Sequence, residues 1–168
     1  MLCQKIRFIL RLGFIGVICL LLLGCQLPGY IWIMPDSNVN NLVFGISGER
    51  SSDVKGKVQS IYVYRCSDIY DRGSTGYYPS TSQAVWIAQT PNQKESPYTN
   101  RIVYGQSQGN FETTQGAQPL DAPGCYTVMA YVDYGEPRAA TVGFKVKEDG
   151  SINQMSDDEF KRLFSRSR

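Results

Sequence analysis

The stretch Thr141-Val-Gly-Phe-Lys-Val-Lys147 alternates apolar and polar side chains along its length. Successive side chains of an extended chain point to opposite faces, so Val142, Phe144 and Val146 share one face and the two lysines share the other. This alternation is typical of a strand that buries one face and exposes the other to water. It predicts a half-buried β-strand in the C-terminal part of the chain.

The same period of two occurs in two stretches upstream. Residues 125–133, Cys-Tyr-Thr-Val-Met-Ala-Tyr-Val-Asp, place Tyr126 and every second residue after it on one face. In residues 58–65, Ile61 and Val63 fall on the face opposite two tyrosines. Weaker strand predictions cover residues 41–47, 83–89, 101–105 and 111–114.

Segments rich in Gly, Ser, Asn and Pro separate these strands and indicate turns. About seven short strands with turns between them predict an all-β fold, a single β-sandwich of immunoglobulin-like or transthyretin-like type. We expect this domain to span residues 41–152. Trp86 lies between Cys66 and Cys125, but one Trp does not by itself make the antibody-domain pattern.

A short helix is expected after the sandwich. Ser156-Asp-Asp-Glu159 is a capping box, in which the Ser side chain and the Glu side chain satisfy each other's backbone N–H groups. Met155 and Phe160 occupy the positions of a hydrophobic staple. Residues 153–168 are therefore predicted to form a C-terminal helix and tail that pack on the sandwich.

The N-terminus reads as a secretory signal. Residues 1–11 carry three basic side chains and no acidic one, and residues 12–23 are uncharged and largely apolar. An apolar run of about 12 residues that follows a basic segment is typical of a signal peptide, whereas a transmembrane helix needs about 20. Residues 1–24 are expected to be this signal peptide.

The end of the signal, Leu22-Leu-Gly-Cys25, closely resembles the bacterial lipobox. The resemblance implies cleavage before Cys25 and acylation of both its thiol and the new N-terminus, and several acyl chains hold a protein firmly on a membrane. The residue after the lipidated position is Gln26 and not Asp, and an Asp there would resemble an inner-membrane retention signal. The outer membrane is therefore favoured. Residues 25–40 are expected to be the lipidated Cys and a tether. The alternative is an uncleaved anchor that extends through residues 31–34.

Two further cysteines, Cys66 and Cys125, are expected to form a disulfide in an oxidising periplasm. A redox or nucleophilic thiol is the alternative, but the chain has no Cys-x-x-Cys and no His to activate a thiolate. We predict a structural bond.

Composition removes several classes of function. The chain contains no His, which excludes Ser-His-Asp and Cys-His catalysis and His-ligated zinc. Three of the 17 basic residues precede Cys25, so the remaining chain is close to neutral, which argues against nucleic acid. Asp68 and Asp71 stand close together, but loop aspartates are more often turn formers than a catalytic pair. We expect no enzymatic activity, cofactor, metal ion or small-molecule substrate.

A long loop over residues 67–82 mixes Tyr with Ser, Gly and Asp. Tyr70, Tyr77 and Tyr78 would supply rigid amphipathic contact area, and the small polar residues adapt around them. This composition predicts a protein-binding surface, and a plain surface loop is the alternative.

Several stretches together resemble a family, the small periplasmic lipoproteins proposed as type VI secretion immunity proteins. The stretches are Val85-Trp-Ile87, Ile102-Val-Tyr-Gly105, Gln118-Pro-Leu120, Gly124-Cys-Tyr-Thr-Val128 and Gly143-Phe-Lys-Val146. The resemblance implies a protein anchored in the outer membrane, facing the periplasm, that neutralises a toxin delivered there. The alternative is a structural or assembly lipoprotein of a cell-envelope complex, docked through a sheet edge or the C-terminal helix.

Overall fold

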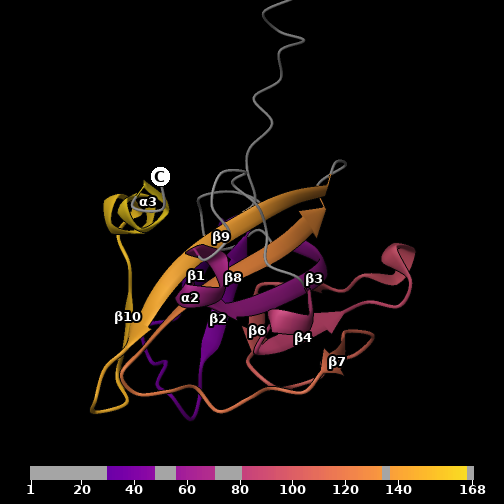
Figure 1. Ribbon diagram of the computed structural model, residues 1–168. Coiled ribbons are helices and arrows are strands. Elements are labelled where there is room, and N and C mark those ends of the chain that lie inside the picture. The colour runs from indigo at the N-terminus through magenta and orange to yellow at the C-terminus, as the bar shows by residue number, and fades with distance from the viewer. Residues whose placement is uncertain (1–29, 48–55, 71–80, 134–136, 166–168) are drawn as a thin grey trace, which may run out of the picture.

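The computed structural model describes residues 30–47, 56–70, 81–133 and 137–165, and in these residues two β-sheets pack face to face (Figure 1). The large sheet contains β3 (Gly56–Arg65), β4 (Trp86–Gln89), β5 (Tyr98–Thr99), β7 (Glu112–Gln115), β8 (Gly124–Asp133), β9 (Pro137–Val146) and β10 (Ile152–Gln154). The small sheet contains β1 (Tyr30–Ile33), β2 (Val43–Ser47) and β6 (Arg101–Val103). The prediction of an all-β sandwich is confirmed.

Neighbouring strands of both sheets run antiparallel. The large sheet has the order β10-β9-β8-β3-β4-β7, with β5 paired to β3, and the small sheet has the order β1-β2-β6. The longest ladder joins β3, β8 and β9, each of ten residues. Its register pairs Ile61 with Ala130 and Ala130 with Ala140, so inward side chains of three strands stand in rows.

The predicted inward residues of these strands form the core. Val142, Phe144 and Val146 are exposed by 6%, 0% and 2%, and they belong to one buried cluster with the inward side chains of β3 and β8. Trp86 lies in the middle of this cluster with no exposed surface, and its ring stacks on Phe44 of the small sheet at 6.4 Å. The two sheets are therefore joined by aromatic and branched side chains that exclude water.

The sandwich begins earlier than the sequence predicted. Residues 30–40 were expected to belong to the tether, but β1 pairs with β2, and Ile31 and Ile33 are buried at 8% and 9% exposure. The backbone N–H of Ile33 donates to Oε1 of Gln154 at 2.8 Å, which links β1 to β10. A four-residue strand next to an apolar signal cannot be separated from that signal by periodicity, because its partner strand decides its structure.

The other strands that the sequence did not predict are also short. β5 and β10 have two and three residues, which is too few for an alternating pattern to be recognised, so the described chain has ten strands where about seven were expected. β10 also carries the sheet past residue 152, where the domain was expected to end. The weaker predictions are represented by β2, β4, β6 and β7 with shifted bounds.

The predicted C-terminal helix is present as α3 (Asp157–Ser165). The N–H of Ser156 donates to Oε2 of Glu159 at 3.2 Å, and the N–H of Glu159 donates to Oγ of Ser156 at 3.3 Å, so the capping box is confirmed. Met155 and Phe160 lie over Gly143 of β9, where an added Cβ would come within 2.6 Å of the Phe160 ring. The helix packs on its own sandwich, at the margin formed by β9 and β10 (Figure 1).

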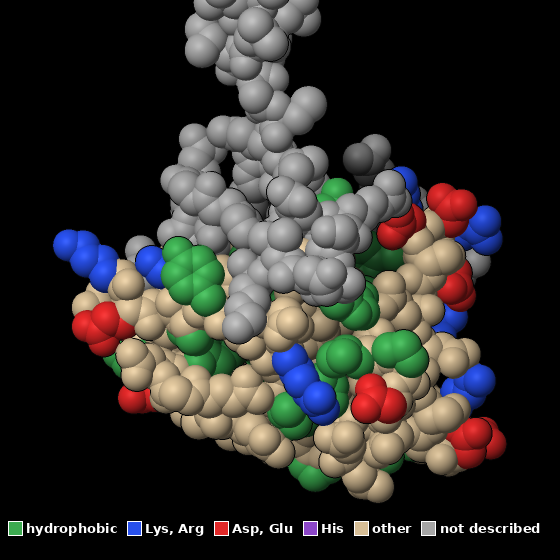
Figure 2. Space-filling view, turned by 180° about the vertical axis from the view of Figure 1, so that it is seen from behind, with side chains coloured by type: hydrophobic (Ala, Val, Ile, Leu, Met, Phe, Trp, Pro, Cys, Tyr) green, Lys and Arg blue, Asp and Glu red, His purple; other side chains and the backbone are tan. Residues whose placement is uncertain are grey.

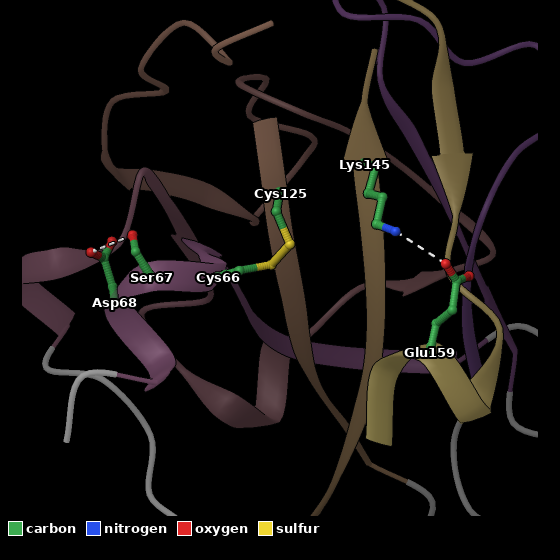
Figure 3. The surroundings of a disulfide bond; sticks show 6 residues. All are labelled: Cys66, Ser67, Asp68, Cys125, Lys145 and Glu159. Carbon is green, nitrogen blue, oxygen red and sulfur yellow. Dashed lines mark hydrogen bonds and ion pairs between the residues drawn. A yellow bond between two sulfur atoms is a disulfide. The ribbon is translucent and has the colours of Figure 1, made fainter. Parts of the chain in front are cut away.

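A second helix, α2 (Cys66–Tyr70), directly follows β3 and was not predicted. Cys66, its first residue, forms a disulfide with Cys125 of β8, across a Cα–Cα distance of 5.3 Å (Figure 3). The predicted pairing is confirmed. The bond closes a sequence separation of 59 residues at the end of the central ladder.

Replacing both Cys66 and Cys125 by Ala should lower the free energy of unfolding by about 4 kcal/mol, because the unfolded chain regains the entropy of the closed loop. Urea unfolding of the oxidised domain and the double variant measures the difference. Wild type treated with reductant is the matched control and should reproduce the loss. Equal midpoints for oxidised and reduced protein would contradict this contribution.

Candidate functional site

The segment predicted to bind a partner leaves the sandwich at the disulfide. α2 is its first part, and the hydroxyl of Ser67 donates to Oδ1 of Asp68 at 3.3 Å within the first turn (Figure 3). Tyr70 is the last residue of this helix. Because Cys66 is bonded to β8, the start of the segment is held at a defined place on the large sheet.

Several candidate residues lie outside the described residues. These are Tyr77 and Tyr78 of the loop, and Cys25 of the lipidation motif. Of Tyr70, the structure gives the backbone position in α2.

Beside α2, the outer face of the large sheet carries an apolar and aromatic surface. We call it the tyrosine platform, made of Tyr62 and Tyr64 of β3, Ile87 of β4, and Met129 and Tyr131 of β8. Ile69 of α2 and Ala84 pack against its buried members. The helix therefore rests on this surface and covers part of it.

The rings of the platform contact one another. Tyr62 and Tyr64 lie nearly parallel with centroids 6.2 Å apart, and Tyr131 meets Tyr62 edge to face at 6.0 Å. Tyr64 is 3% exposed, whereas Tyr62 and Tyr131 are partly exposed. Rings that pack on each other lose little further conformational freedom when a partner covers them, which favours binding.

Burial also controls the ionisation of this surface. Removal from water, and after it the neighbouring phenols of Tyr62 and Tyr131, together raise the pKa of Tyr64 to about 12. The Tyr64 phenol is therefore neutral across the physiological range. At Tyr64 the platform therefore presents a neutral hydroxyl and ring rather than a charge.

A polar cluster lies near the disulfide end of the ladder. Nε of Arg65 donates to Oδ2 of Asp121 at 3.1 Å, its guanidinium also reaches Oε1 of Gln118 at 3.4 Å, and the hydrogen bond to Asp121 raises the pKa of Arg65. The hydroxyl of Tyr126 donates to the same carboxylate at 3.3 Å, and that of Tyr104 donates to the Gln118 carbonyl at 2.7 Å. These contacts hold residues 116–123 against β3 and β8, and this role is structural.

The described residues contain no group of three acidic, Cys or His side chains placed to hold a metal ion. Asp68 lies in α2, and Asp71, its expected neighbour, is outside the described residues. In the same part of the chain, no helix has the length and apolar character that crossing a bilayer requires.

Figure 2 shows the molecule from the side opposite to Figure 1. Basic and acidic side chains are interspersed around the described part of this face, and hydrophobic side chains appear in separate patches.

Comparisons with protein families, with characterised proteins and with solved structures find no match for this chain. The sequence had placed Tyr62 and Tyr64 on the face opposite Ile61 and Val63 but named neither as a binding residue, and it did not single out Tyr131. The sequence feature that could have indicated this surface is the set of large side chains on the face opposite Ile61 and Val63. In a sheet that buries only one face, such side chains form an exposed apolar patch.

Stability should fall as the pH rises above 10. The Tyr64 phenol has a pKa of about 12 in the folded protein against an ordinary value of 10.0, so the unfolded chain releases this proton first. Tyr64 therefore makes its full contribution to the free energy of unfolding below pH 10. This contribution, at most roughly 3 kcal/mol, is lost between pH 10 and about 12. Urea unfolding at several pH values measures the slope.

Tyr64→Phe should make this slope shallower. Part of the loss remains in that variant, because burial also raises the pKa of Tyr104 and Tyr126. A slope identical to that of wild type would show that Tyr64 ionises normally in the folded state.

Proposed function

We propose that this chain is a lipoprotein anchored in the outer membrane that binds another protein in the periplasm, as a type VI secretion immunity protein that neutralises a periplasm-directed toxin. The lipobox-like end of the signal at Cys25 supports the anchor and the compartment. The family resemblance of the strand segments supports the immunity role. No catalytic residue is required for this function, because covering a toxin's site is enough.

One observation carries the binding role: a disulfide fixes α2, the start of the Tyr-rich segment, beside a platform of partly exposed tyrosines. Cys66 and Cys125 hold α2, and Tyr62 and Tyr131 lie beside it with accessible rings. Interfaces of high affinity depend on a few aromatic anchors placed on a surface that does not rearrange. The segment over residues 67–82 and the tyrosine platform would together form such a surface.

A specific feature also favours the alternative, a structural lipoprotein of an envelope complex. β7 is the last strand in the order of the large sheet, and its side chains are alternately exposed and partly exposed. An edge strand offers backbone N–H and C=O groups to a strand of a partner. This candidate predicts recruitment through the edge or through α3 and tolerance of changes in the platform.

The test of the immunity role is a calorimetric titration of the soluble, oxidised domain from residue 27 against the product of the adjacent gene. We expect 1:1 binding with a Kd near or below about 1 nM, as tight inhibitors require. Periplasmic expression of that product should be toxic, and the full chain should rescue the cells. Absence of both binding and rescue would refute the immunity role.

Variants then locate the surface. Tyr131→Ala, and separately Tyr77→Ala with Tyr78→Ala, should each weaken binding by about thirty-fold, the effect of losing an aromatic anchor. Tyr98→Ala is the control, because Tyr98 is 68% exposed on β5 and is not a member of the platform. Unaltered affinity in both platform and loop variants would place the interface elsewhere. Deleting residues 157–168 tests the alternative, which requires loss of complex recruitment.

A further inference from the structure

A groove of about 320 Å³ lies where β1 runs beside β9 and the start of α3. Tyr30 and Trp32 of β1 line it together with Asp157 and Phe160 of α3. Both β1 aromatics are partly exposed. Trp32 lies so close to Gly45 of β2 that any side chain there would meet its indole, so the ring is held in place. The groove therefore has a fixed aromatic wall at Trp32.

Asp157 is the one charged residue among the described residues that line this groove. Nearby, Glu159 is paired with Nζ of Lys145 at 3.0 Å and accepts the N–H of Ser156 (Figure 3). Asp157 has no such partner among the described residues. Aromatic faces beside a free carboxylate recognise an ammonium group, through the ring quadrupole and the opposite charge.

The position of β1 in the chain brings this groove near the membrane. This step rests on the lipidation of Cys25 in the proposed function. Tyr30 is the fifth residue after Cys25, and five residue-to-residue steps span at most about 18 Å when fully extended. Trp and Tyr are enriched at the interface of bilayers, where the ring is apolar and its N–H or O–H meets headgroups.

We propose that this groove faces the bilayer that holds the acyl chains of Cys25, and that it receives phospholipid headgroups ending in a primary ammonium, as in phosphatidylethanolamine. The ammonium pairs with Asp157. The rings of Tyr30 and Trp32 lie in the interfacial layer beside it. The lipid anchor thus holds the domain in one orientation rather than on a loose tether.

The two tryptophans of the chain make this orientation measurable. Trp32 lines the groove, whereas Trp86 has no exposed surface. The full-length lipidated protein is reconstituted into vesicles of phosphatidylethanolamine and phosphatidylglycerol, with acyl chains brominated near the headgroup. The difference in emission between wild type and Trp32→Phe isolates Trp32, and we expect brominated lipid to lower that difference at least about two-fold.

Flotation with the vesicles separates the outcomes. Wild type that floats but shows no quenching of Trp32 would overturn the proposed orientation and leave the anchor intact. Wild type that does not float, like Cys25→Ala, would overturn both the anchor and the orientation. Neither result depends on whether a toxin is bound, so the immunity role is tested separately.

A second comparison tests Asp157 itself. Quenching of Trp32 should be at least about two-fold stronger in vesicles that contain phosphatidylethanolamine than in vesicles of phosphatidylglycerol alone, because only the first lipid carries an ammonium. Asp157→Asn should remove this preference. Asp158→Asn is the matched control, because Asp158 lies in the same turn and does not line the groove. Equal quenching in both lipids by wild type would refute the role of Asp157.

Discussion

The antiparallel ladder of β3, β8 and β9 is the constraint on which the rest of the structure depends. Each strand has ten residues, and their register brings the inward side chains into rows that pack against Phe44 of the small sheet. Only long strands can align several inward residues at once, and the short strands of both sheets pack around this core. The disulfide from Cys125 adds α2 to the same ladder.

The ladder has two faces, and the second face is where function is proposed. Successive side chains of β3 point to opposite faces, so Ile61 and Val63 lie in the core and Tyr62 and Tyr64 lie on the outer face. α2 covers part of this outer face, and the tyrosines it leaves accessible are packed on one another. A surface of this kind has less conformational freedom to lose on binding than a free loop. The proposed groove for lipid lies elsewhere, at the margin where β1 meets β9 and α3.

Local patterns predicted the features that depend on local interactions. The capping box at Ser156 and Glu159 predicted the start of α3, since both hydrogen bonds form within one turn. The alternation around Phe144 predicted both the strand and its buried face. β1 was missed because its burial depends on β2 and β10, which follow it at a distance in the sequence. α2 was missed because a five-residue helix held by a disulfide and by Ile69 has little local signal.

The sequence by itself determined the class of fold, the pairing of Cys66 with Cys125, the C-terminal helix and the expectation of export with a lipid on Cys25. These follow from periodicity, from an even number of available cysteines and from motifs read within a few residues. The tertiary structure decided that residues 30–33 are a strand, that Tyr62, Tyr64 and Tyr131 meet on one surface, and that Asp157 faces the same groove as Trp32. Those contacts join residues far apart in the chain, and their geometry arises only when both sheets and α3 have packed together.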